Sequence, residues 1–60
     1  MQPYQYLEQV AREFDRLTDR RQVETVLDEL EFLYDALDPE FQDLCADLIE
    51  RLTARLQELA

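Results

Sequence analysis

The side chains of this chain that can do chemistry are mainly carboxylates. Of 60 residues, 15 are acidic, and the sequence contains no histidine, lysine, serine, asparagine, glycine or tryptophan. The missing types exclude a serine or lysine nucleophile, a histidine base or metal ligand, and a glycine-rich phosphate loop. Paired carboxylates can act as acid and base, but so small a chain offers no deep cleft to shift their pKa values. We therefore expect no enzyme, no catalytic residue and no cofactor.

Metal binding and thiol chemistry are also disfavoured. A carboxylate metal site would need ligands converging from two helices, and the chain has neither an EF-hand loop nor a Glu-x-x-His pair, so we expect no metal. The single cysteine, Cys45, cannot form an internal disulfide. It keeps helical phase with Phe41 and Leu48, which predicts a small core residue.

The negative charge is concentrated in the middle of the chain. Residues 24–50 hold ten carboxylates and no basic residue, which gives −10, against −9 for the whole chain, so the flanks contribute +1. Such a surface repels nucleic-acid phosphates and the anionic leaflet of a membrane. We expect no direct binding to nucleic acid or membrane, and a basic protein as the complementary partner.

Eight of these carboxylates form two stripes with steps of three and four residues. Each stripe lies along one edge of a helix, where like charges cost about 0.2 to 0.5 kcal/mol per pair. One interpretation is a solvated face that keeps the protein soluble. The other is an electrostatic docking surface, in which charges repeating every roughly 6 Å can imitate nucleic-acid phosphates. The candidate partner-binding residues are Glu24, Asp28, Glu31 and Asp35 in the first stripe, and Glu40, Asp43, Asp47 and Glu50 in the second.

Phe32 is the apolar residue that breaks the helical pattern around it. At about 100° per residue it lies roughly 160° from the centre of the neighbouring apolar stripe. It is either a singly exposed aromatic side chain or an interface anchor, since aromatic residues ringed by polar groups dominate binding hot spots. Its helical neighbours are Thr25, Asp28, Glu29, Asp35 and Ala36.

Three helices must position these side chains. Apolar residues recur at helical spacing over about residues 4–18, 20–37 and 39–59, and no alternating strand pattern competes with them. The core positions are Leu7, Val10, Phe14 and Leu17; then Val23, Val26, Leu27, Leu30, Leu33, Tyr34 and Leu37; then Phe41, Leu44, Cys45, Leu48, Ile49, Leu52, Leu56 and Leu59.

Two breaks separate these segments. Asp38 and Pro39 form a strong signal, because Asp caps a helix, Pro suits its first position, and the residue before Pro avoids helical geometry. The break at residues 18–20 is inferred from phase, since one continuous helix places the Leu7 and Leu30 stripes on nearly opposite sides. Asp19 and Gln22 have capping-box spacing. An unbroken helix with two apolar faces is the alternative.

The pattern predicts an all-α fold, a small antiparallel helical bundle formed by a single domain over residues 1–60. It is either a three-helix up-down-up unit or a helical hairpin with an N-terminal docking helix. The third segment has an apolar arc of roughly 140°, and its Leu56 and Leu59 extend beyond what the first helix covers. We therefore expect a homodimer.

The stretch ALDPEFQDLCADL, with the leucines before it, resembles the turn and second helix of the repressor-of-primer family. The resemblance covers about a third of the chain and implies a helical hairpin that dimerises into a four-helix bundle. That family binds RNA through a basic face of its first helix, whereas the corresponding helix here is acidic, so no functional residue is carried over.

The N-terminal sequence lacks the basic start and apolar centre of a signal peptide, and no apolar run reaches the roughly 18 residues of a membrane span. The expected location is cytoplasmic. The expected function is that of a non-enzymatic regulator or adaptor that binds a macromolecular partner through its second and third helices. The alternative is an inhibitor or antitoxin-like protein that mimics nucleic acid and neutralises a basic, nucleic-acid-binding protein.

Overall fold

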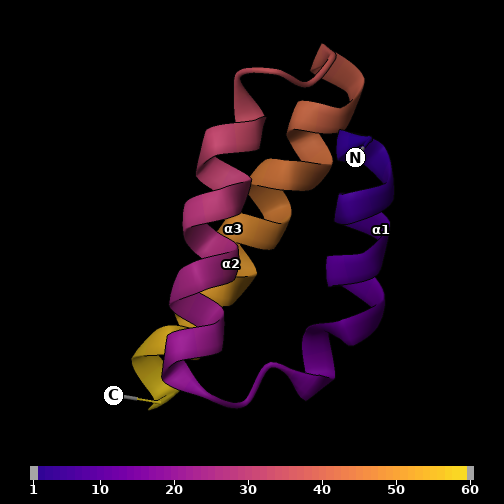
Figure 1. The fold of residues 1–60 in the computed structure, drawn as a ribbon. Coiled ribbons are helices and arrows are strands. Elements are labelled where there is room, and N and C mark those ends of the chain that lie inside the picture. The colour runs from indigo at the N-terminus through magenta and orange to yellow at the C-terminus, as the bar shows by residue number, and fades with distance from the viewer. Residues whose placement is uncertain (1, 60) are drawn as a thin grey trace.

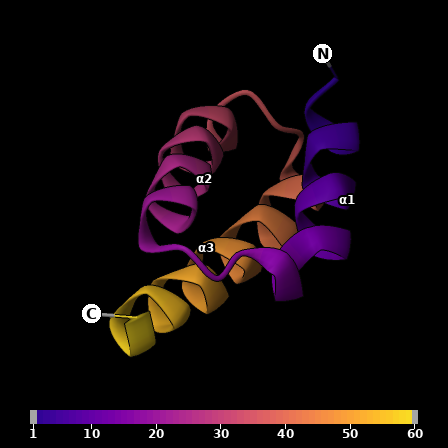
Figure 2. The ribbon, with the colours of Figure 1, turned by 60° about the horizontal axis from the view of Figure 1, so that its bottom comes forward.

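A computed structural model describes residues 2–59 as an up-down-up arrangement of helices, with no strand in that range. The elements are α1 (Pro3–Glu13), a short 3₁₀ helix η1 (Phe14–Arg16), α2 (Arg20–Tyr34) and α3 (Pro39–Leu59). Figure 1 shows α1 and α3 running in the same direction, with α2 antiparallel to both. Figure 2 shows α3 passing diagonally beneath α1 and α2, which agrees with its contacts to each of them.

The first helix is shorter than the sequence predicts. It ends at Glu13 rather than near residue 18, and Phe14–Arg16 tighten into a 3₁₀ turn in which Leu17 N donates to Phe14 O at 3.2 Å. The Phe14 ring of this turn packs against Arg51 and Arg55 of α3. The tighter winding is a common way to end an α-helix.

The chain breaks between α1 and α2, so the alternative of one continuous helix is wrong. Asp19 has extended backbone geometry, and its Oδ1 accepts a hydrogen bond from Arg21 N at 3.1 Å. A carboxylate at this position satisfies one of the free N–H groups of the first turn and complements the helix dipole. The prediction of a cap at Asp19 is confirmed.

The second helix ends at Tyr34, three residues before the predicted end. Ala36 N donates to Leu33 O at 2.9 Å and Leu37 N donates to Tyr34 O at 3.3 Å, so the last turn closes with shorter-range hydrogen bonds. This turn brings Leu37 into the core with 8% of its surface exposed. Pro39 then opens α3 as predicted, and the Asp38 carbonyl accepts from Phe41 N and Gln42 N.

A single apolar core lies between the three helices. Two members of the predicted third stripe, Leu44 and Leu59, remain 37% exposed, and Tyr34 of the second is 36% exposed. The apolar arc of α3 is therefore wider than the surface its two neighbours cover. The buried core consists of Leu7, Val10, Val23, Leu30, Leu37, Cys45, Leu48 and Leu52.

None of the helices within the described range is both long enough and apolar enough to cross a membrane.

Candidate functional site

Phe32 lies on the outer face of α2 with 82% of its surface exposed. Leu30, two residues earlier, is completely buried, because two residues of a helix span about 200° and face opposite sides. The sequence-based placement of Phe32 outside the core is confirmed. Its neighbours one turn away, Asp28, Glu29 and Asp35, are exposed, so an apolar ring lies among carboxylates on a solvent-facing helix.

All eight carboxylates of the two stripes are exposed to solvent. Within residues 2–59, only two of them have an arginine partner: Glu24 accepts from Arg20 Nε at 3.0 Å, and Asp47 lies 3.9 Å from Arg51 Nη1. The Asp47 pair and the pair between Glu8 and Arg12 at 3.1 Å both have the four-residue spacing that favours ion pairs on a helix surface. Most of the negative charge of the stripes is therefore not neutralised inside the molecule.

The stripe on α2 borders α3. Glu29 lies on the side of α2 toward Tyr6 of α1, whose pKa its negative charge raises. At about 100° per residue, the stripe lies on the other side of the buried face from Glu29. That side is the edge next to α3, whose Gln42 Nε2 donates to Tyr34 O at 2.9 Å.

The stripe on α3 faces solvent, on the side of that helix nearer to α1. Arg51 and Arg55 of α3 contact Phe14 at the end of α1, and the α3 stripe follows Arg51 around the helix surface. The ion pair between Asp47 and Arg51 agrees with this placement. The two stripes therefore lie on different faces of the bundle, and the structure does not bring them together into one acidic surface.

Phe14 is held by two arginines that sequence analysis did not single out. The guanidinium carbons of Arg51 and Arg55 lie 4.5 and 4.4 Å from the ring centroid. Arg55 Nη1 also donates to Leu17 O at 3.3 Å, which ties α3 to the connection between α1 and α2. One signal was available in the sequence: Arg55 follows Leu48 and Leu52 at helical spacing, so it lies within the apolar arc of α3.

Tyr6 links α1 to α2 at a partly buried position. Burial raises the pKa of its phenol well above the ordinary value, and hydrogen bonding to Glu29 and the negative charge of Glu29 raise it further. Tyr4 has its pKa raised mainly by its hydrogen bond to Glu8. Both phenols therefore keep their protons to a higher pH than a free tyrosine does.

Cys45 is a buried free thiol in the core, as its phase predicts. Its Sγ donates to the carbonyl oxygen of Leu30 at 3.4 Å, and burial raises the pKa of the thiol. A protonated, inaccessible thiol is a poor nucleophile. Across residues 2–59, no three metal-ligating side chains of the Cys, Asp or Glu type lie close enough together to hold a metal ion.

Comparison of the chain with protein-family models, with curated proteins and with solved structures finds no match, so the local resemblance to the repressor-of-primer family has no support beyond its residues.

Proposed function

We propose that this protein is a small, non-enzymatic interaction module that binds a basic protein through the outer face of α2 and the adjoining surface of α3. The observation that carries the proposal is the exposure of Phe32, at 82%, among exposed carboxylates. An aromatic ring supplies large contact area at low entropic cost, and flanking charges steer a partner of opposite sign.

The charge distribution supports a basic partner. The overall charge is −9, and six of the eight stripe carboxylates have no arginine partner within residues 2–59. A partner that supplies arginine or lysine side chains would relieve the repulsion along each stripe. Because the stripes lie on different faces of the bundle, a partner with a flat binding surface can contact only one of them. The α2 stripe, which borders Phe32, is the one we assign to this contact.

Co-purification from the native host, followed by affinity measurement with the captured partner, tests the proposal. Phe32→Ala is expected to weaken binding by about 2 kcal/mol or more, roughly thirtyfold, because truncation of an anchoring aromatic residue commonly costs that much. The control is Gln57→Ala, which shortens an exposed side chain at the far end of α3. Equal affinities for the wild type and Phe32→Ala would contradict the proposal.

The second candidate is an inhibitor that mimics nucleic acid, and the favourable observation is the unneutralised carboxylates repeating along α2 and α3. Salt dependence separates the two functions. A mimic loses affinity steeply as ionic strength rises and competes with DNA or RNA for its target, whereas a contact anchored by Phe32 is much less sensitive to salt.

We also propose that the chain is a homodimer, on the strength of the exposed apolar side chains Leu44 and Leu59 on α3. Sedimentation equilibrium at micromolar concentration tests this directly. We expect a mass of twice 7.2 kDa, and a stable, folded species of 7.2 kDa would contradict the dimer.

A further inference from the structure

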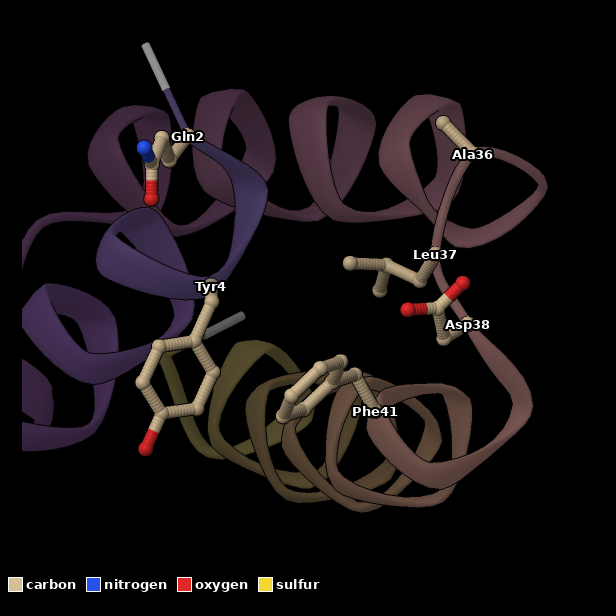
Figure 3. A pocket seen from close by; sticks show the side chains of 6 residues that line it. All are labelled: Gln2, Tyr4, Ala36, Leu37, Asp38 and Phe41. Atoms are coloured by element: carbon tan, nitrogen blue, oxygen red, sulfur yellow. The ribbon is translucent and has the colours of Figure 1, made fainter.

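A small cavity lies at the end of the bundle where α1 begins and α2 connects to α3. It has a volume of about 220 Å³. Figure 3 shows the rings of Tyr4 and Phe41 beside each other, with Leu37 and Asp38 approaching from the connection. The residues that line it are Gln2, Tyr4, Ala36, Leu37, Asp38 and Phe41.

The lining combines two aromatic rings with one carboxylate. The ring centroids of Tyr4 and Phe41 are 4.7 Å apart at an angle of 51°, and Tyr4 is 43% exposed. The Asp38 side chain is exposed at the rim. Aromatic faces attract cations, and a nearby carboxylate adds a charged acceptor. The cavity therefore suits a flat or compact cation that has an apolar stem.

The size of the cavity limits the occupant. Sites for small molecules enclose about 300 to 1,000 Å³, which is more than the cavity provides. One long side chain from another protein is the occupant that fits an open site of this size. Since residues 24–50 carry no basic side chain and the cavity lies against them, a cationic side chain meets no local repulsion.

Arginine matches this lining better than lysine does. Its planar guanidinium stacks on rings and can donate two parallel hydrogen bonds to one carboxylate, whereas the lysine ammonium is a strongly hydrated point charge. The same molecule already uses this contact at its other end, where Arg51 and Arg55 lie 4.5 and 4.4 Å from the Phe14 centroid.

We propose that this cavity binds an arginine side chain of the basic partner, with its guanidinium against Tyr4 and Phe41 and hydrogen-bonded to the Asp38 carboxylate. This inference rests on the proposed function, since it names the group of the partner that the chain recognises. It adds a second contact to that of Phe32, at the end of the bundle where α2 connects to α3.

The test is a titration of the ¹⁵N-labelled chain with N-acetyl-arginine N-methylamide, followed by NMR, with the lysine analogue in a parallel experiment. We expect dissociation in the millimolar range, as for a single side chain, with the largest shifts at the amides of Ala36, Leu37 and Phe41. Asp38→Asn and Phe41→Leu should each weaken binding about tenfold. Asn keeps the helix-capping ability of Asp, so the first variant retains the start of α3.

Asp15→Asn is the matched control, because it removes the same charge from the exposed surface of η1 at the other end of the bundle. If Asp15→Asn and Asp38→Asn weaken binding of the arginine analogue equally, the binding is general charge attraction and the proposed arginine site is wrong. Equal binding of the lysine analogue would overturn the choice of arginine.

Affinities of the captured partner for three variants distinguish failure of this inference from failure of the proposed function. If Phe32→Ala abolishes binding but Asp38→Asn and Phe41→Leu do not, the proposed function stands and the proposed arginine site is wrong. Unchanged binding in all three variants contradicts both.

Discussion

Cys45 Sγ donates a hydrogen bond to the carbonyl oxygen of Leu30 at 3.4 Å, across the interface between α2 and α3. Both residues are completely buried. The contact joins the two helices that carry the acidic stripes, which form the most extensive helix pair in the fold. The reactivity of Cys45 therefore reports whether α2 and α3 are together or apart.

Alkylation of Cys45 by iodoacetamide should be at least about a hundredfold slower in the folded protein than in urea, because the thiol is buried and its pKa is raised. The control is Ala46→Cys in a Cys45→Ala background. Residue 46 is exposed, so its thiol should react at the rate of the unfolded chain. Similar rates for the two folded proteins would mean that α2 and α3 separate readily.

Leu30→Ala and Phe32→Ala should differ sharply in their effect on stability. The first leaves a cavity at a fully buried position and should lower the free energy of unfolding by about 2 to 5 kcal/mol, whereas the second, at 82% exposure, should change it by no more than about 0.5 kcal/mol. Urea titrations followed by circular dichroism measure both values. A comparable loss in the two variants would place Phe32 in a buried interface.

Arg55→Ala should lower the free energy of unfolding by about 1 to 2 kcal/mol, because it removes a charged hydrogen bond to Leu17 O and a contact with the Phe14 ring. Hydrogen exchange of the Leu17 and Thr18 amides should become faster, since α3 no longer holds that connection. Arg16→Ala, at an exposed position of η1, serves as the comparison and should have little effect. Equal stabilities of the two variants would argue against the Phe14 contact.

Titration of the Tyr6 phenol should lower the stability of the fold at alkaline pH. Its pKa is raised above the ordinary value of 10.0 in the folded state, so the folded chain keeps a proton that the unfolded chain loses. The stabilisation is fully present below pH 10 and is lost as the pH rises toward the folded pKa. Tyr6→Phe should therefore lose stability less steeply between about pH 10 and 12.

This pH comparison is best made in a Cys45→Ala background, because the raised thiol pKa produces a loss in the same direction starting above its ordinary value of 9.0. Urea midpoints across the alkaline range give the slopes. Parallel slopes with and without the Tyr6 hydroxyl would mean that the partly buried environment of Tyr6 is not kept in solution.

The parts of the fold that depend on local chemistry could be predicted from the sequence. Pro39 restricts the residue before it and fits the first position of a helix, and Asp19 supplies an acceptor to a helix start. Helical phase placed Phe32 outside the core and Cys45 within it. Each of these depends on a residue and its neighbours within one or two turns.

The parts that depend on contacts distant in sequence could not be predicted in this way. The 3₁₀ turn that begins at Phe14 packs against Arg51 and Arg55, which lie 37 or more residues away in the sequence, so the spacing of residues along α1 could not predict this contact. The early end of α2 has the same origin, since Leu37 turns inward to complete a core shared with α1 and α3. The pairing of Tyr4 with Phe41 likewise becomes visible only once α1 and α3 are side by side.

Gln2 and Leu59 lie at opposite ends of the described structure, and this affects how the protein can be immobilised. Gln2 borders the cavity beside Tyr4, whereas Leu59 lies at the other end of a molecule 32 Å long (Figure 1). An affinity tag or a surface linkage attached after Leu59 leaves the cavity end and the outer face of α2 open to a partner. The same tag placed before Gln2 lies next to the cavity that Gln2 lines. A capture experiment made only in that orientation would therefore hinder the proposed binding of the partner's arginine.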